Sequence, residues 1–265
     1  MSTLAATAGS ISRAGAVTAW HARTYKRVWF ATITTAFLNP IFFLLSIGVL
    51  LGTLVDDGNA DLGGLSYLEF VAPGLLAVTA MQLGTNDATF PVLAGIKWLR
   101  TFHGVVATPV RVSELVFGGF AWSAIRMLVA LVVFAAIAAL GGAFVSPLAV
   151  LAPLAALLCG LAFTAPIAAF SGRLKDASSI PALTRFAIIP MFLFAGTFFP
   201  VSQLPDWLEP VAWATPLWHG VTLCRDLTSG SVEALTALMH VGYLLAWFVA
   251  GTAAAIVVFR RRLMT

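Results

Sequence analysis

The chain has 265 residues, of which 60% are hydrophobic and only 10% are charged, and its mean hydropathy is +0.96. A soluble domain carries about 25% charged residues, so this composition excludes a soluble enzyme, a nucleic-acid binder and a disordered chain. The apolar runs are continuous and long enough for helices, which excludes an outer-membrane barrel with its alternating strands. The composition therefore predicts an all-α, polytopic membrane protein that forms a single transmembrane domain over residues 1–265.

The segment before the first apolar run is polar, basic and aromatic. Residues 10–30 include Trp20, Tyr25 and Trp29, and this composition suits an amphipathic helix that lies on the inner membrane surface. A plain juxtamembrane anchor of basic and aromatic residues is the alternative interpretation. Residues 1–28 lack a long apolar core, so we expect no cleavable signal peptide.

Six stretches are apolar over a length that suits a helix crossing the hydrocarbon core, which takes about 20 residues. In chain order they are about Ala31–Val55, Tyr67–Phe90, Ala121–Phe144 (entered through Leu115–Phe120), Leu148–Phe170, Ala182–Phe199 and Thr236–Phe259. The polar connectors between them are Asp56–Ser66, Pro91–Glu114, Ser171–Pro181 and Pro200–Glu233, and the tight turn is Gly141–Pro147. Residues 260–265 form a short tail.

The basic residues fall in alternate connectors, and basic residues are retained on the cytoplasmic side of a membrane. With the N-terminus inside, twelve lie inside: Arg13, Arg23, Lys26, Arg27, Lys97, Arg100, Arg111, Arg173, Lys175, Arg260, Arg261 and Arg262. Only Arg225 then lies outside, while Arg126 and Arg185 lie at inner span ends and can snorkel inward. This bias predicts a cytoplasmic (inner) membrane protein with both termini cytoplasmic, Asn59 outside and Ser178 inside.

Few polar side chains fall inside the predicted spans. Gln82 and Asn86 are four residues apart on one face of the second span, and Asp87 follows near its inner end. Such side chains line a translocation path or hydrogen-bond to a neighbouring helix, and both interpretations stay open. No acidic residue lies at the centre of a predicted span, which argues against an ion-coupled carrier with a proton relay.

Enzyme signatures are absent from the sequence. There is no GxSxG or HExxH motif and no GxxxxGK[ST] phosphate loop, and the four histidines are scattered along the chain. We therefore expect no catalytic, cofactor-binding or metal-binding residues in this chain. Cys159 lies in an apolar run and Cys224 in a polar segment, so we expect no disulfide between them.

The inner connector Pro91–Glu114 is longer than a simple link between two spans. Its apolar residues recur at helix-like spacing: Trp98, Leu99, Phe102, Val105 and Val106. This spacing predicts a short amphipathic helix that ends before Pro109, with Trp98 and Phe102 on one face. Such a helix lies on the lipid or fills a groove in a partner protein.

The outer connector Pro200–Glu233 holds three of the eight tryptophans: Trp207, Trp213 and Trp218. Thr215-Pro216 is a good helix start, because a capping hydroxyl precedes a proline at the first helical position. The helix that follows, with Arg225, has about 12 residues and is too short to cross. We predict two short helices in the outer leaflet, anchored by these tryptophans. An exposed loop is the alternative.

Three parts of the chain carry a recognisable pattern: Tyr67–Leu76 with Ala80–Gln82, Lys97-Trp98 through Ala107–Pro109, and Phe194–Leu208 with Thr215–Gly220 and Arg225–Leu227. They resemble the membrane subunits of the second exporter class of ATP-binding-cassette (ABC) transporters, in the branch of nodulation-factor and daunorubicin-type export permeases. The resemblance covers about residues 20–262. It implies a six-span permease that works as a homodimer or heterodimer with two separately encoded ATP-binding subunits, which bind ATP and Mg.

The resemblance also implies roles for the two long connectors. The inner one would be the coupling helix in a groove of the ATPase, and the outer helices would close the extracellular end of the path. Relatives often have an acidic residue in place of His103 and a larger residue in place of Gly104. This departure from the family pattern would imply a weaker coupling contact or one matched to a different ATPase surface.

The expected function is ATP-driven export of an amphipathic or lipid-linked molecule, such as a drug, glycolipid or polysaccharide. The chain itself would be a permease subunit and not an enzyme. Its expected partners are an ABC ATP-binding subunit, a second permease copy and membrane lipid. The alternatives are an ion-coupled or passive carrier, a membrane enzyme, and a non-transporting assembly scaffold.

Overall fold

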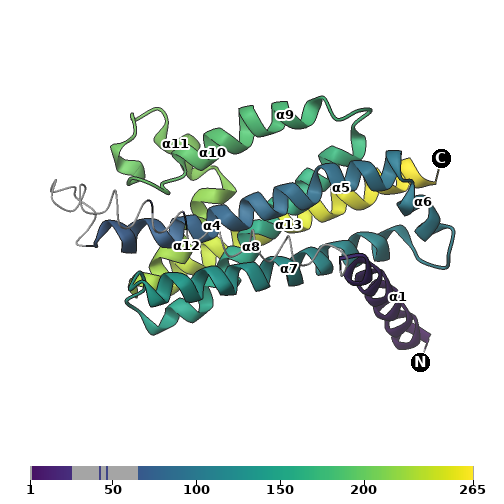
Figure 1. Cartoon of the computed structure of the whole chain (residues 1–265), viewed down its shortest axis with the longest axis horizontal. Helices are drawn as coiled ribbons and strands as arrows, with labels where there is room; N and C mark the ends of the chain where they lie inside the picture. The colour runs from purple at the N-terminus through teal and green to yellow at the C-terminus, as the bar shows by residue number, and fades with distance from the viewer. Residues whose placement is uncertain (1, 26–41, 43–45, 47–64, 265) are drawn as a thin grey trace.

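The computed structural model describes residues 2–25, 42, 46 and 65–264 (Figure 1). The predicted first span, Ala31–Val55, and the connector that holds Asn59 lie almost entirely outside the described residues. Within the described part the regular elements are all helices. Four of these helices are long and apolar enough to cross a membrane, which confirms an all-α membrane architecture for this part of the chain.

The N-terminal helix α1 covers Ser2–Tyr25. It extends outward from the end of the bundle where the C-terminus also lies (Figure 1). It packs on the first part of α7, Val112–Leu140. The contact is close, because a Cβ on Gly118 would lie 2.6 Å from the carbonyl oxygen of Ala14. The predicted segment 10–30 is therefore helical to Tyr25, and its residues 26–30 lie outside the described part.

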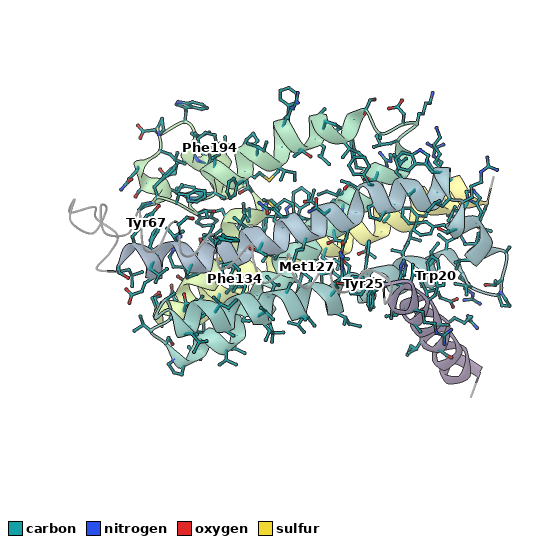
Figure 2. The ribbon with its side chains drawn as sticks, viewed as in Figure 1. Trp20, Tyr25, Tyr67, Met127, Phe134 and Phe194 are labelled. Carbon is teal, nitrogen blue, oxygen red and sulfur yellow. The ribbon has the colours of Figure 1, made fainter. Side chains whose placement is uncertain are left out.

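The four long helices form the body of the molecule (Figure 1). They are α4 (Tyr67–Ala88) continued by α5 (Phe90–Leu93) and the π-helical turn η2 (Ala94–Trp98), then α7, then η3 (Pro147–Leu151) with α8 (Ala152–Arg173), and finally α13 (Ala234–Leu263). Ser66 and Glu69 form a capping box at the start of α4. Met127 and Phe134 of α7 point into the core (Figure 2) and are buried.

Three predicted boundaries were wrong. The second span continues through Pro91 to Trp98, because proline is tolerated in the first turn of α5. The third begins at Val112 and ends at Leu140, so Phe144 lies in the turn that follows. The last continues to Leu263, because Arg260 to Arg262 extend the helix beyond its apolar part.

Small residues let α8 lie in close contact with its neighbours. A Cβ on Gly84 of α4 would lie 2.5 Å from the carbonyl oxygen of Gly160, and a Cβ on Gly251 of α13 would lie 2.5 Å from Pro166. Such small residues permit the close helix approach that stabilises membrane bundles. The helix α8 is therefore the centre of the described bundle.

The predicted fifth span, Ala182–Phe199, corresponds to a shorter helix. It runs through α9 (Ser179–Leu183), η4 (Thr184–Ile188) and α10 (Ile189–Phe194), or 16 residues. This length is below the roughly 20 residues that span a bilayer, so the count of six spans stays a prediction. In Figure 1 the helix lies above α4 and α5, and its residues Leu183, Ile188 and Met191 pack on the hydrophobic core.

The outer connector folds into η5 (Val201–Gln203), α11 (Glu209–Trp213) and α12 (Pro216–Ser229). The Thr215 hydroxyl accepts a hydrogen bond from the Trp218 amide at 3.3 Å, which confirms the predicted helix start. Buried residues of α12, such as Leu217 and Val221, pack against α4, α8 and α13. The helix is thus part of the bundle, and the exposed-loop alternative is wrong for it.

Candidate functional site

One end of the bundle gathers the connectors that were predicted to be cytoplasmic. The Lys97 ammonium donates a hydrogen bond to the carbonyl of Lys175. Arg262 donates through Nη2 to the carbonyls of Arg173 and Leu174, each at 2.9 Å. The ring of Phe102 lies 5.9 Å from that of Phe259. The inner connector, the 171–181 connector and the C-terminal helix therefore meet in one place.

The inner connector does not form the single amphipathic helix that the sequence predicts. The η2 turn ends at Trp98, Arg100 has a left-handed backbone with φ of 52°, and the six-residue helix α6 (Thr101–Val106) then begins. Trp98 and Phe102 therefore do not share a helix face, because the left-handed residue breaks the helix between them.

The two aromatic residues also have different surroundings. Trp98 and Leu99 are 56% and 71% exposed, whereas Phe102 is buried against Gly95 and Phe259. Val105 and Val106 are partly buried and pack on the core. Of the five residues predicted to couple to an ATPase, Trp98 and Leu99 are thus exposed apolar residues, while Phe102 holds the connector to the bundle.

A groove of about 380 Å³ lies between α1 and the α6 segment. Its walls are Ala16, Val17 and Trp20 on one side and Thr101, Gly104, Val105, Thr108 and Val110 on the other. A Cβ on Gly104 would meet no atom within 4 Å, so the absence of a larger residue there leaves this groove open. Sequence reasoning missed the groove because it depends on how two segments far apart in the chain dock.

An ion pair fastens α1 to the base of α7. Arg13 donates through Nε and Nη2 to the Glu114 carboxylate at 2.8 Å, and that carboxylate also accepts from the Arg111 amide at 2.8 Å. The hydrogen bond to Glu114 raises the pKa of Arg13 above its ordinary value. Glu114 lies three residues after the N-cap residue Arg111. A glutamate at this position is a helix-start signal that can be read from the sequence.

The polar residues of α4 divide into two groups. The side chains of Gln82 and Asn86 are exposed, one turn apart. Asp87 instead forms an ion pair with Arg126 of α7 and accepts a hydrogen bond from Ser123. Arg126, expected to snorkel inward, is therefore held by Asp87, and the amides of Gln82 and Asn86 are the uncharged polar surface of this helix.

Two of the three tryptophans of the outer connector lie together, because the ring centroids of Trp213 and Trp218 are 6.3 Å apart. Trp207 precedes α11 and is 72% exposed, whereas Trp213 ends α11. Trp218 is half-buried in the first turn of α12, with its ring 5.3 Å from that of His240. The sequence pattern did not separate these settings because all three residues lie in one polar connector.

The histidines, scattered in the sequence, include one close pair. Nδ1 of His219 on α12 lies 2.7 Å from Nδ1 of His240 on α13. The His219 ring stacks on Tyr243 with centroids 3.9 Å apart. This cluster joins the two helices, but among the described residues no group of three or more metal-ligating side chains exists. Cys159 and Cys224 are both buried as free thiols.

Arg225 connects three elements at the opposite end of the bundle, where Figure 2 places Tyr67 and Phe194. Its guanidinium lies 3.8 Å from the centroid of the Phe70 ring. Nη2 donates to the carbonyl of Gly196 at 2.7 Å, and Nε donates to the carbonyl of Phe70 at 3.3 Å. The predicted outer arginine is thus the link that joins α12 to α4 and to the turn after α10.

We expect Arg225→Ala to loosen this end of the bundle. Hydrogen bonds to charged groups contribute about 1.5–3 kcal/mol each, so amides in residues 195–200 should exchange with solvent at least tenfold faster. Hydrogen–deuterium exchange on the purified protein measures this, with Arg111→Ala, at the other end, as the control. Unchanged exchange in residues 195–200 would show that Arg225 does not hold this end of the bundle together.

Comparison with known proteins decides the family. The chain matches the ABC-2 type transporter family over residues 14–228. It belongs to that family. It is 30% identical over 242 residues to Nodulation protein J of Rhizobium meliloti (strain 1021), covering 91% of this chain and 90% of the relative. Nodulation protein J of Bradyrhizobium diazoefficiens matches with the same identity and coverage.

A more distant relative extends the comparison beyond the nodulation proteins. The inner membrane transport permease YadH of Escherichia coli (strain K12) is 22% identical over 209 residues, with 75% of each chain covered. The family assignment confirms the resemblance drawn from the three sequence segments. This ABC-2 chain is therefore a multi-pass membrane permease subunit, and its four long apolar helices agree with that role.

Proposed function

We propose that this ABC-2 chain works as the membrane subunit of an ATP-driven exporter in the cytoplasmic membrane, with ATP hydrolysed on a separate subunit that binds ATP and Mg. The observation that carries the proposal is the family match over residues 14–228. The sequence holds no phosphate loop of its own, so the energy has to arrive through a contact with a partner.

The inner connector is the surface that best suits this contact. It lies at the end of the bundle where the basic connectors gather, and Trp98 and Leu99 are exposed beside it. The groove between α1 and α6 adds a concave apolar surface there. Exposed apolar residues with a polar rim are typical of protein interaction sites, so we assign this end to the ATP-binding subunit.

A second permease copy completes the transport path in this proposal. Gln82 and Asn86 expose two amides on a membrane-spanning helix, and polar groups in lipid are costly unless a protein surface or water satisfies them. The helix α9–α10 exposes Phe186, Ile189 and Leu193 and packs little on the bundle. These two surfaces favour a path between two copies, in a homodimer or a heterodimer.

An amphipathic or lipid-linked substrate suits such a path. The amides of Gln82 and Asn86 bind uncharged polar groups, and Asp87 is neutralised by Arg126. The apolar helices on either side accommodate acyl or ring systems. An ion-coupled carrier is disfavoured because the carboxylate Asp87 is engaged in this ion pair. A non-transporting scaffold would bind its partners without any response to ATP, and that difference separates it from the exporter.

The proposed orientation makes a labelling prediction. Ser178 and Ser231 lie in connectors at opposite ends of the bundle, and both are exposed. Single cysteines there, with Cys159 and Cys224 replaced, should react differently with an impermeant thiol reagent on intact cells. The twelve-to-one distribution of basic residues predicts labelling at position 231 only. Labelling at 178 with protection at 231 would reverse the orientation.

A substrate screen tests the transport role. The permease is purified with the ATP-binding subunit encoded in the same organism and reconstituted in lipid vesicles. We expect amphipathic compounds to stimulate ATP hydrolysis, because a transported substrate shifts the permease toward the conformation that engages ATP. ATP hydrolysis that no compound alters, in a complex that is intact, would favour the scaffold.

A further inference from the structure

Two histidine rings meet where the first turn of α12 packs on α13. Nδ1 of His219 lies 2.7 Å from Nδ1 of His240, and the ring centroids are 4.9 Å apart. A neutral imidazole has one donor nitrogen and one acceptor nitrogen. The two rings are therefore hydrogen-bonded only while one of the two Nδ1 atoms carries a hydrogen and the other does not.

The remaining ring nitrogens decide which histidine donates. The His219 ring donates a hydrogen bond to the backbone carbonyl of Trp213, and because its Nδ1 faces His240, we place that hydrogen on Nε2. His240 then donates from Nδ1, and its own Nε2 carries a lone pair. His240 is only 3% exposed, and its Nε2 has no hydrogen-bond partner among the described residues.

The neutral pair offers an added proton two places, and both are unfavourable. On Nδ1 of His219, a proton would set two N–H groups against each other and break the hydrogen bond. On Nε2 of His240, it would place a positive charge in a buried position without an acceptor, which is costly. Protonation is therefore coupled to separation of the rings, because separated rings can be solvated.

The pair lies at the centre of an aromatic cluster that fixes the start of α12. The Tyr243 ring stacks on His219 with centroids 3.9 Å apart, and the Tyr243 hydroxyl donates to the Ala214 carbonyl at 2.6 Å, just before the helix. The Trp218 ring lies 5.3 Å from that of His240. Loss of the histidine contact would therefore loosen the start of α12 from α13.

Within the described residues, neither ring forms an ion pair with a carboxylate. Besides Tyr243, the titratable or charged groups on the elements that pack around this half of the bundle are Tyr67 and Glu69 on α4, Cys159 on α8, Glu209 on α11, Arg225 and Asp226 on α12, and Glu233 before α13. Burial, and then the neighbouring His240, lower the pKa of His219 to about 4, from an ordinary value of about 6.5.

We propose that the His219–His240 pair is an acid-sensitive latch that holds the start of α12 against α13 while both rings are neutral and releases it when the outer compartment becomes acidic. This inference rests on the orientation in the proposed function, which places the start of α13 outside. His240 lies six residues after Ala234, or about 9 Å along the helix, so the pair is near the outer surface.

The direction of the pH dependence follows from the depressed pKa of His219. The free ring binds a proton below about pH 6.5, whereas the paired ring does so only near about pH 4. The latch therefore contributes its full stability above about pH 6.5, and this stability is lost progressively as the pH falls toward about 4.

Hydrogen–deuterium exchange at about pH 7 and about pH 5 tests the latch, on the purified permease in detergent with a metal chelator present. The rates are corrected for the intrinsic dependence of amide exchange on pH. We expect amides in residues 218–224 of the wild type to exchange roughly tenfold faster or more at the lower pH, because opening then releases a ring that binds a proton.

Three variants make the result specific. In His219→Gln with His240→Gln the two amides can bond to each other without ionising, so exchange should differ by less than about twofold between the two pH values. His219→Ala removes the pair, so this segment should exchange at neutral pH at least as fast as the wild type does in acid. His21→Gln, a histidine of α1, should keep the wild-type response.

Either of two results would contradict the inference. One is corrected exchange in the wild type that is equal at both pH values. The other is a double glutamine variant that keeps the wild-type response, because another group would then be the sensor. Exchange in detergent does not depend on which end of the bundle faces outward. Failure of the proposed orientation would appear instead as thiol labelling at position 178 with protection at 231.

Discussion

Recovery of the ATP-binding subunit with the permease should fall by roughly tenfold or more when Trp98 and Leu99 are both replaced by alanine. These residues are 56% and 71% exposed at the end of η2, and their side chains are the apolar surface that the connector offers to a partner. Aromatic residues at the centre of an interface commonly contribute about 2 kcal/mol or more each. Because about 1.4 kcal/mol corresponds to a factor of ten, the loss should be visible in a co-purification at equal membrane levels of permease.

Two other substitutions make this result specific. Trp207→Ala removes a tryptophan of similar exposure at the opposite end of the molecule and should leave recovery unchanged. Phe102→Ala removes the ring that packs on Phe259, so it should lower the thermal stability of the permease itself. Equal recovery of the ATP-binding subunit with wild type and with the Trp98/Leu99 variant would rule out the coupling role of these residues.

Gly84→Val should prevent α4 and α8 from packing together. A Cβ at Gly84 would lie 2.5 Å from both the carbonyl oxygen of Gly160 and the Thr164 hydroxyl. Backbone cannot yield as a flexible side chain does, so the helices have to separate. Overpacking typically costs about 1–3 kcal/mol, and we expect more here because the clash is with backbone in the centre of the bundle. Thermal unfolding in detergent should show a much lower midpoint, or no folded protein.

The matched control is Gly242→Val in α13. This glycine is also helical, but a Cβ there would meet no atom within 4 Å, and the side chain would face outward. Its unfolding midpoint should stay within a few degrees of the wild type. Equal midpoints for Gly84→Val and Gly242→Val would contradict the close packing of α4 and α8.

The continuous apolar runs made four long helices predictable, because a helix that crosses lipid has to be apolar over most of its length. The start of α12 was predictable from Thr215 and Pro216, because a cap is a local feature. The ends of helices were less predictable. Pro91 suggests a helix boundary in the sequence, but it occupies the first turn of α5. The fifth apolar stretch forms a helix of 16 residues, because the chain turns at Ala195.

The functional site depends on contacts between distant segments, which local patterns do not contain. Helical spacing placed Trp98 and Phe102 on one face, but the left-handed Arg100 separates them. Asp87 was a candidate for the path, and its pairing with Arg126 appears only when α4 meets α7. The partners Arg13 and Glu114 are 101 residues apart. The position of Glu114 near the start of α7 was a local signal for a helix start. It did not indicate that Arg13 would be its partner.

The central claim is that this ABC-2 permease is driven by a separate ATP-binding subunit. The most direct test is native mass spectrometry and ATP hydrolysis on the permease purified from the membranes of its own organism. We predict a complex with equal numbers of permease and phosphate-loop subunits, whose ATP hydrolysis is lost when the phosphate-loop lysine of the partner is replaced. A permease that is recovered without any nucleotide-binding subunit, and whose membranes hydrolyse no ATP above the level of permease-free membranes, would contradict the account.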